Sequence, residues 1–228
     1  LKKCNYVGVR GPISKKLLEI NGLDNVEITG DPALFFAKKE IKQKKKNKKL
    51  GINIGVSNGN IWGNEDDVLE FIVKFSKIMI DKGWELAFFP VWGKDIPYIE
   101  EAAKKIGRKL FIFPHYRSIG RALDFLEGCD VFIGEKLHSV ILSMCTYTPS
   151  IMLEYRPKCR DFMASMQMDD LNMRTDRLSL DSLIDLTEKL YDNSEYYQRE
   201  IFLKANFYKQ IQKEKALSIT KSILGIED

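Results

Sequence analysis

Short apolar runs alternate with helical patterns along most of this chain, between residues 50 and 192. The apolar runs are Gly51–Val56, Leu86–Val91, Leu110–Phe113, Val131–Ile133 and Ser150–Leu153. The segments with helical spacing that follow them are 67–81, 96–106, 119–126, 136–145 and 158–168. Parallel strands need such crossover helices, and a sheet covered on both faces has strands that are apolar throughout. The alternation therefore predicts one α/β domain with a Rossmann-like, doubly wound parallel sheet.

Shorter elements flank this domain. Tyr6–Val9 and Val26–Thr29 have the composition of strands, and a helix between them should begin near Pro12. Residues 195–224 form one long helical stretch that carries five aromatic side chains. Because that apolar face must be covered, we expect the helix to pack across the domain or toward a neighbouring one.

The positive charge of the chain is concentrated in one stretch. Residues 38–49 hold eight Lys and one Glu, a local charge of +7, whereas the whole chain carries only +4. Subtracting +7 from +4 leaves −3, so the rest of the protein is mildly acidic and general nucleic-acid affinity is not expected. We interpret 38–49 as a solvated linker, with a patch for nucleic acid or anionic lipid as the alternative.

The cysteines and the apolar stretches indicate the compartment. Cys4, Cys129, Cys145 and Cys159 are far apart and form no Cys-x-x-Cys pair, which argues against a disulfide framework and a metal site. The longest uncharged stretch, residues 137–153, contains a histidine and a proline, so no transmembrane segment is expected. With no secretory signal at its start, the chain is expected to be cytoplasmic. Its first residue is not Met, which suggests a fragment or a processed product.

The turn from Gly134 to Ser139 is the leading candidate for a ligand site. It follows the strand Val131–Ile133, and ligands of open parallel sheets collect at the carboxyl ends of strands, beside helix amino termini. Lys136 and His138 should lie in the first turn of the next helix. His138 is one of only two histidines, and proton transfer is its expected role. The alternative for His138 is a hydrogen-bonded structural histidine.

Other strand ends also carry polar side chains. The loop 57–64 has two glycines and small polar residues that suit an anion or a sugar, with a plain surface loop as the alternative. Trp92–Asp95 follows the next strand, His115 the strand after that, and the last strand leads to Glu154, Arg156 and Lys158. Arg10 follows the first strand of the chain. The cations together suit an anionic small ligand, although solvation alone explains any one of them.

The ordered motifs resemble the polysaccharide pyruvyl transferase family. The blocks that carry the resemblance are 9–14 (VRGPIS), 29–34 (TGDPAL), 134–138 (GEKLH), Pro149, and 155–162 (YRPKCRDF). The sequence departs from the family at Lys136, where Arg is frequent, and in its lysine-rich stretch. The resemblance implies a GT-B-like plan of two Rossmann-like domains, with the amino-terminal domain mostly absent. It assigns 1–37 to the tail of that domain, 38–49 to the linker, 50–192 to the donor-binding domain and 193–228 to a helix returning toward the first domain.

The resemblance also implies a function: pyruvate moves from phosphoenolpyruvate onto a sugar as a ketal. His138 would transfer the proton, with Lys136, Arg10, Arg156 and Lys158 around the donor's phosphate and carboxylate. Remaining candidates are Ser57, Asn58 and Asn60 for donor binding and His115, Ser139 and Glu154 in secondary roles. The expected acceptor is a glycan or a lipid-linked sugar, which would bring the protein to the inner face of the membrane by peripheral contact. No cofactor is expected.

Two other functions remain open from the sequence. One is a GT-B-type glycosyltransferase that uses a nucleotide sugar, whose donor domain usually grips a ribose with an acidic residue late in the domain. Arg156, Lys158 and Arg160 in that region favour an anionic donor instead. The other is a non-catalytic fragment that keeps the fold.

Overall fold

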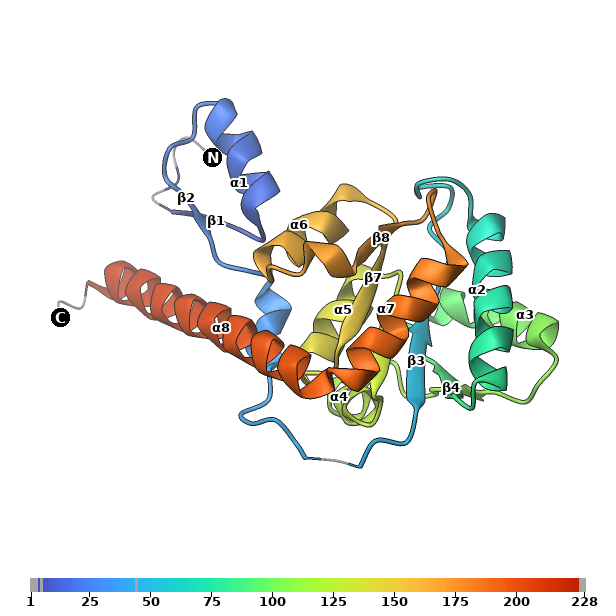
Figure 1. The fold of residues 1–228 in the computed structure, drawn as a ribbon. Coiled ribbons are helices and arrows are strands. Elements are labelled where there is room, and N and C mark those ends of the chain that lie inside the picture. The colour runs from blue at the N-terminus through green and yellow to red at the C-terminus, as the bar shows by residue number, and fades with distance from the viewer. Residues whose placement is uncertain (1–3, 5, 44, 226–228) are drawn as a thin grey trace.

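A six-stranded parallel sheet forms the centre of this computed structural model, which describes residues 4, 6–43 and 45–225 (Figure 1). Its strands are β3 (Lys49–Asn53), β4 (Glu85–Phe88), β5 (Phe111–Ile112), β6 (Val131–Gly134), β7 (Ser150–Glu154) and β8 (Asn172–Arg174). They lie in the order β5-β4-β3-β6-β7-β8, and all neighbouring pairs are parallel. This is the strand order of a doubly wound Rossmann-like fold, so the predicted fold class is confirmed.

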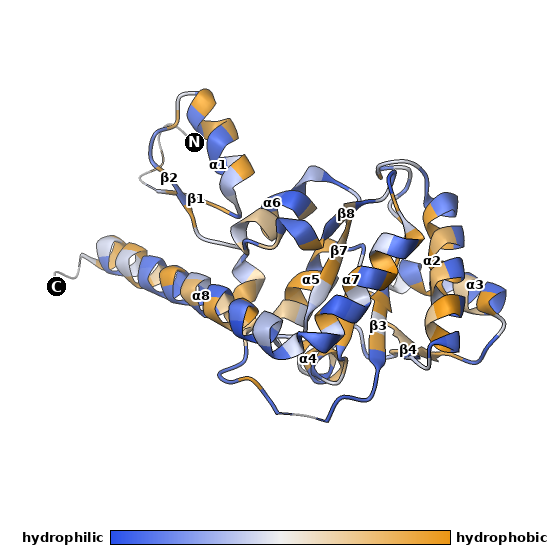
Figure 2. Ribbon diagram, viewed as in Figure 1, coloured by the Kyte–Doolittle hydropathy of each residue, from blue (hydrophilic) through white to orange (hydrophobic). Residues whose placement is uncertain are grey.

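Helices cover both faces of the sheet. One face is covered by α2 (Glu65–Asp81), α3 (Ile96–Ile106) and α7 (Leu180–Asp192). The other is covered by α4 (Ile119–Glu127), α5 (Leu137–Met144) and α6 (Pro157–Ser165). Figure 2 shows apolar residues along the central strands and the inward sides of these helices, with hydrophilic residues outside. The central strands are buried on both faces, which explains their nearly continuous apolar sequence.

Some elements differ from the sequence prediction. The first strand of the sheet spans Lys49–Asn53 rather than Gly51–Val56, because the chain turns away after Asn53 to enter the loop before α2. The strand β8 and the helix α7 were not predicted. β8 has the sequence Asn-Met-Arg and is only partly buried at the sheet edge, so it lacks the apolar pattern that identifies the other strands.

A small amino-terminal unit lies beside the sheet domain. It consists of β1 (Val7–Val9), α1 (Pro12–Ile20) and β2 (Val26–Ile28), and its two strands are parallel. Asp161 of α6 binds the start of α1: its carboxylate accepts hydrogen bonds from the backbone N–H of Ile13 (2.8 Å) and of Ser14 (3.2 Å). The Ser14 hydroxyl donates to the same carboxylate at 2.5 Å. A buried carboxylate therefore caps α1 and fixes this unit to the sheet domain.

The carboxyl-terminal helix α8 (Ser194–Leu224) runs from the sheet domain toward the amino-terminal unit (Figure 1). Near its middle it packs on the 3₁₀ helix η1 (Pro32–Phe36), where the Lys209 ammonium lies 5.8 Å from the centre of the Phe35 ring, and it also contacts α5. Farther along, Gln212 donates to the carbonyl oxygens of Thr29 and Asp31, and Lys215 pairs with Glu27 at 2.8 Å. These are the contacts expected of a helix that returns toward the first segment, while the domain boundaries themselves stay a prediction.

The described residues of the lysine-rich stretch 38–49 have no helix or strand before β3, and its role as a linker stays a prediction. Several of its lysines nevertheless contact the domain. Lys38 pairs with Glu127 at 2.9 Å, and the ammonium of Lys46 donates to the carbonyl oxygen of Tyr191 at 2.6 Å. Lys44, which belongs to the predicted linker, and residues 1–3, 5 and 226–228 of the predicted terminal segments lie outside the described residues.

Candidate functional site

The candidate site lies where the order of the sheet reverses, between β3 and β6. Asn53 at the end of β3 pairs with Gly134 at the end of β6, so the two loops that follow start side by side. One loop leads to α2 on one face of the sheet, and the other leads to α5 on the opposite face. Ligands of doubly wound sheets bind at such switch points.

Asn53 joins the two loops. Its side chain is fully buried; the amide donates to the carbonyl oxygen of Phe89 at 2.8 Å, and its oxygen accepts from the backbone N–H of Lys136 at 2.8 Å. The Ser139 hydroxyl lies 3.0 Å from the same oxygen. The sequence analysis missed Asn53, although an amide in an otherwise apolar strand was a usable signal, since buried polar groups need specific partners.

Lys136 carries the positive charge of the switch point. Its side chain is buried, and its ammonium donates to the carbonyl oxygen of Val56 at 3.0 Å and to the Ser57 hydroxyl at 2.5 Å. The Glu135 carboxylate lies 3.6 Å from that ammonium. Lys136 is thus held by the β3 loop and reaches the place where a ligand would lie above both strands.

Two carboxyl groups lie behind Lys136. Both belong to segments predicted as candidate strand ends, 134–139 and 92–95, but neither was given a role in the site. Burial raises the pKa of Glu135 to about 7, against an opposing effect of Lys136. Burial also raises the pKa of Asp95, although the backbone N–H groups of Trp92 and Val91 donate to its Oδ2 atom. Its Oδ1 atom is buried and has no hydrogen-bond partner among the described residues. Two acids with raised pKa values beside one lysine are typical of functional sites.

Gly55 allows this crowding. A Cβ atom at this position would lie 2.3 Å from Oδ1 of Asp95 and 2.8 Å from Cε of Lys136. Any side chain there would therefore push the acid or the lysine out of place. The glycine is required by close approach and not by an unusual backbone angle, because its φ is not in the left-handed region.

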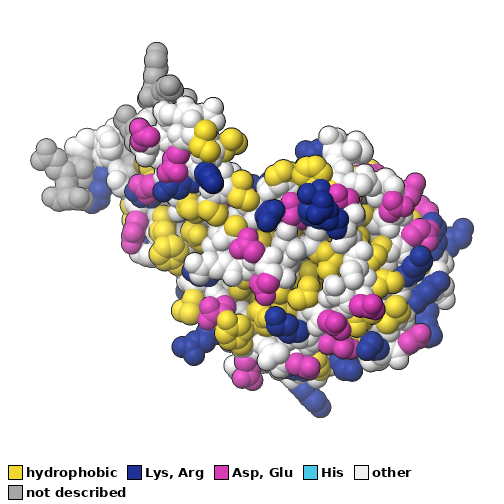
Figure 3. Space-filling view, turned by 45° about the horizontal axis from the view of Figure 1, so that its top comes forward, with side chains coloured by type: hydrophobic (Ala, Val, Ile, Leu, Met, Phe, Trp, Pro, Cys, Tyr) yellow, Lys and Arg dark blue, Asp and Glu magenta, His cyan; other side chains and the backbone are white. Residues whose placement is uncertain are grey.

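A pocket of about 310 Å³ opens above this point. Its lining residues are Val56, Ser57, Trp92, Lys94, Lys136, Tyr155 and Arg156. Three of them are cations and none is an acid, so the pocket offers positive charge to a ligand. Figure 3 turns the top of Figure 1 toward the viewer and shows Lys and Arg side chains gathered near the middle of that face.

Tyr155 brings the cations of the β7 end together. Its ring centre lies 5.0 Å from the ammonium of Lys136, 4.9 Å from that of Lys158 and 6.0 Å from the guanidinium of Arg156. Partial burial lowers the pKa of Lys158, and the charges of Arg156, Arg10 and Lys136 lower it further. These four cations, all predicted from the sequence as donor-binding residues, are therefore close enough to act on one another.

Arg10 reaches the cluster from the amino-terminal unit. Its Nε atom donates to Oδ2 of the buried Asp31 at 2.6 Å, which fixes the direction of the guanidinium. The side chain of Arg10 remains 29% exposed. The Nε edge of the Arg10 guanidinium is thus occupied by Asp31, and its remaining N–H groups can bind another partner.

The predicted loop after β3 is tied down at its start. Oε1 of Glu65 accepts from the backbone N–H groups of Ser57 at 2.5 Å and of Gly59 at 3.3 Å, so neither group is free for an anion. Asn60 is exposed, and its carbonyl oxygen accepts from Nε of Arg156 at 2.8 Å. Asn58 is exposed as well. Of the predicted residues Ser57, Asn58 and Asn60, only Ser57 lines the pocket.

His138 lies on the first turn of α5 and is exposed, whereas Leu137 and Ser139 beside it are buried. It makes no hydrogen bond or ion pair with the described residues. A structural histidine would have a buried partner, so this alternative is not supported. His138 follows Lys136 by two residues in the chain but is not among the residues that line the pocket, so its role in proton transfer stays a prediction.

The secondary candidates have other surroundings. His115 follows β5, the outermost strand, and contacts Nη1 of Arg121 at 3.0 Å, away from the switch point. Ser139 is buried, and its hydroxyl bonds Asn53 and the carbonyl oxygen of Lys136 at 2.6 Å, which makes it part of the scaffold. Glu154 is also buried and accepts from Nδ2 of Asn172 at 2.5 Å. None of these three lines the pocket.

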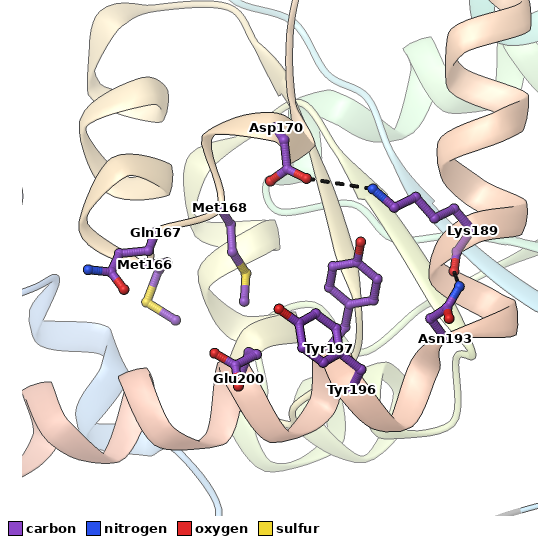
Figure 4. Close-up of a pocket in the computed structure, with 9 residues that line it drawn as sticks. All are labelled: Met166, Gln167, Met168, Asp170, Lys189, Asn193, Tyr196, Tyr197 and Glu200. Atoms are coloured by element: carbon purple, nitrogen blue, oxygen red, sulfur yellow. Dashed lines mark hydrogen bonds and ion pairs between the residues drawn. The ribbon is translucent and has the colours of Figure 1, made fainter.

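A larger pocket, of about 640 Å³, lies between the end of α6 and the junction of α7 with α8 (Figure 4). Asp170 and Glu200 contribute acids, and the one lysine, Lys189, pairs with Asp170 at 3.8 Å. The exposed ring of Tyr196 stands at its side. This pocket lies at the amino ends of the strands and has no excess of positive charge, so it does not suit an anionic donor.

Within residues 4, 6–43 and 45–225, no group of three or more His, Cys, Asp or Glu side chains could hold a metal ion. Among the same residues, no helix combines the length and the apolar character needed to cross a membrane.

Solved structures show the fold class of the chain. A putative UDP-N-acetylglucosamine 2-epimerase from Listeria monocytogenes aligns with a TM-score of 0.59 at 13% identity, over 99% of this chain and 61% of that one. TarM aligns with a TM-score of 0.52 at 16% identity, over 99% and 44%. At such identities the likeness shows the fold alone, which is GT-B-like. The chain spans less than two thirds of the length of either structure.

Sequence comparison identifies the family. No curated protein matches the chain. The family model of polysaccharide pyruvyl transferases matches residues 1–157, a range that includes Arg10, Lys136, His138 and Arg156. Since this match covers more than half of the 228 residues, the chain belongs to the polysaccharide pyruvyl transferase family.

Proposed function

We propose that this chain forms the donor side of an enzyme that transfers pyruvate from phosphoenolpyruvate to a sugar of a polysaccharide or of its lipid-linked precursor. The single observation that carries the proposal is the pocket at the switch point, whose charged lining residues are all cations. Phosphoenolpyruvate carries a phosphate and a carboxylate on three carbons. A small donor with two anionic groups suits several fixed cations around about 310 Å³.

The reaction defines what these residues would do. Two sugar hydroxyl oxygens bond to the central carbon of phosphoenolpyruvate, the methylene carbon gains a proton and becomes a methyl group, and the phosphate leaves with the other proton. Lys136 and Arg10 would stabilise the phosphate and the carboxylate as charge develops. His138, exposed beside Lys136, would carry the proton.

The neighbouring cations would complete the donor site. Arg156 reaches the pocket from the end of β7, and Lys158 lies beside the same tyrosine ring. The Ser57 hydroxyl would donate a hydrogen bond to phosphoenolpyruvate. Asn58 and Asn60, which are exposed in the same loop, would contact the donor only if the loop closed over it.

A glycosyltransferase with a nucleotide-sugar donor is the alternative from a different class of donor. The fold supports it, because a variant of TarM from S. aureus, described as a complex with fondaparinux, alpha-GlcNAc-glycerol and UDP, aligns at 18% identity with a TM-score of 0.51 over 99% of this chain and 44% of that one. The β7 end argues against it here. Its acid, Glu154, is buried and bound to Asn172, so it is not available to a ribose.

Calorimetric titration of the chain with phosphoenolpyruvate and, separately, with uridine diphosphate tests the proposal. We expect binding of phosphoenolpyruvate and weaker or no binding of the nucleotide. Stronger binding of the nucleotide would support the glycosyltransferase instead. If neither ligand binds, the chain by itself has no donor site and the non-catalytic alternative stands.

The same proposal has consequences for the acceptor and the location. Phosphoenolpyruvate is a metabolite of the cytoplasm, so the reaction would take place there. A lipid-linked acceptor would bring the protein to the inner face of the membrane through peripheral contact. Fractionation of cells that make the full-length protein, with and without a high-salt wash, would test this contact.

A further inference from the structure

Glu135 is a buried acid directly behind the donor pocket. Its side chain is 1% exposed. The Oε2 atom accepts from the backbone N–H of Gly55 at 3.2 Å, and the Oε1 atom accepts from the Ser57 hydroxyl at 3.4 Å. Oε1 also lies 3.6 Å from the ammonium of Lys136. The acid thus holds the two groups, Ser57 and Lys136, that line the pocket above it.

The charges around Glu135 do not balance when every acid is ionised. Lys136 is the cation in contact with it, while Asp95, at the start of α3, acts on it as a second negative charge. The charge of Glu135 also acts on Tyr98 of α3 and on Tyr155 at the end of β7. Both tyrosines are neutral near pH 7, because burial raises their pKa values. Lys94 and Arg156 also line the pocket, but among the described residues only Lys136 forms an ion pair with Glu135. At close range two carboxylates therefore act on one ammonium, and an incoming anion adds more negative charge.

We propose that Glu135 takes up one proton from solvent when an anionic donor binds beside Lys136. The inference deepens the proposed function and rests on its anion site. The proton ends on a carboxyl oxygen of Glu135, and no other bond changes. The neutral acid then no longer attracts the Lys136 ammonium or competes for the Ser57 hydroxyl, so both groups can turn toward the donor.

Geometry and burial favour Glu135 over the other acid as the proton acceptor. Asp95 binds two backbone N–H groups through Oδ2, contacts that favour its ionised form. Glu135 accepts one backbone N–H and contacts both ligand-facing groups. Burial places the pKa of Glu135 at about 7, so a nearby anion only has to raise it further for the proton to stay bound at neutral pH.

Sulfate is a suitable probe because it resembles the phosphate group but does not itself titrate near neutral pH. Calorimetry in two buffers of different ionisation enthalpy, at about pH 7.5, gives the number of protons taken up per sulfate bound. We expect uptake of a fraction of one proton by the unchanged chain. We also expect the affinity to fall as pH rises through about 7, by about tenfold for each unit by which the anion raises the pKa of Glu135.

Two variants assign the proton. Glu135→Gln keeps the shape of the acid without its charge, so sulfate should still bind, most of the uptake should disappear, and the affinity should depend much less on pH. Asp95→Asn is the matched control, and it should keep the proton uptake.

The outcomes separate this inference from the proposed function. Sulfate binding with no proton uptake would refute the role of Glu135 and leave the anion site intact. Equal uptake in the Glu135→Gln variant, or loss of uptake only in Asp95→Asn, would refute it as well. If the unchanged chain does not bind sulfate at all, the anion site is wrong and this inference falls with it.

Discussion

At the scale of single residues, the donor pocket depends on the charge of Lys136. The substitution Lys136→Met keeps an unbranched, apolar stem and removes the ammonium that lies among Val56, Ser57 and Tyr155. Hydrogen bonds to charged groups are the strong ones, so we expect phosphoenolpyruvate to bind roughly tenfold more weakly or worse. Calorimetric titration measures this loss. Lys104→Met, an exposed lysine on α3, is the control and should bind like the unchanged chain.

His138 tests the proton step separately from binding. We expect His138→Gln to retain most of the affinity for phosphoenolpyruvate, while turnover by the full-length enzyme falls by roughly 10²- to 10⁴-fold, as for other general acids and bases. The assay is phosphate release that depends on the acceptor polysaccharide. Unchanged turnover would exclude His138 from proton transfer, whereas a parallel loss of binding would make it a donor-binding residue.

Residue type and position along the chain were enough to find part of this site. The position of Lys136 could be predicted because a strand, a glycine and a helix start stand together in the sequence, while the role of His138 stays a prediction. The amide of Asn53 in an apolar strand does indicate a buried polar group, but the partners of Asn53 and Glu135 could not be predicted in the same way. Their roles arise from hydrogen bonds between chain segments about 80 residues apart, such as Asn53 with Lys136 and Gly55 with Glu135, and no local pattern encodes those contacts.

At the scale of secondary structure, the close approach of β3, α3 and α5 at Gly55 should be essential. The substitution Gly55→Ala places a methyl group where Asp95 and Lys136 lie, so we expect lower thermal stability and loss of sulfate binding. Gly120→Ala, in α4, has open space around the added methyl group and should leave binding unchanged with equal or slightly higher stability. Melting curves and sulfate titration of both variants measure the difference.

The contact between α1 and α6 is a second element-scale test. Asp161→Ala removes the carboxylate that binds the first N–H groups of α1, so the amino-terminal unit should loosen while the sheet remains. Leaving such groups unpaired costs about 1–3 kcal/mol each when they stay buried. Hydrogen exchange should show faster exchange in residues 12–20 and unchanged protection in β6 and β7. Faster exchange throughout would mean that Asp161 supports the whole fold.

The elements were predicted where one physical pattern dominates. Strands such as β6 and β7 are buried on both faces and therefore apolar throughout, which makes them visible in the sequence. The edge strand β8 is only half-buried, so its sequence is not apolar throughout. The apolar sequence continues past the end of β3, because Ile54 remains in the core after the strand has ended. Sequence pattern reports burial more directly than it reports hydrogen-bonded pairing, so strand ends and edges are the parts that it misses.

At the scale of the whole molecule, the charges are divided between two regions with different tasks. The lysines of 38–49 supply the net positive charge of the chain. Some of them contact surface groups at the amino ends of the strands, as Lys38 does with Glu127. The cations at the opposite edge are fewer and gather around one pocket. Net charge alone therefore does not indicate a polyanion partner, because the functional cations are the ones placed by the fold.

The buried acid should also make the stability of the molecule depend on pH. The pKa of Glu135 is raised from 4.5 to about 7 by burial, so the folded protein holds this proton more tightly than the unfolded chain does. The resulting stabilisation is fully present below about pH 4.5 and is lost as pH rises through about 7, with a total of up to about 3 kcal/mol. Asp95, whose pKa is also raised, acts in the same direction.

Thermal melts between about pH 5 and pH 8 test this effect without any ligand. The melting temperature of the unchanged chain should fall across this range, and Glu135→Gln should reduce the fall and be the more stable form at the alkaline end. Glu100→Gln, on the exposed side of α3, should leave the slope as it is. An equal slope in all three proteins would mean that Glu135 is ionised in the empty site throughout this range. Glu135 would then gain a proton on donor binding only if the donor raised the pKa of Glu135 by several units. This measurement therefore also limits how strongly donor binding and protonation of Glu135 are coupled.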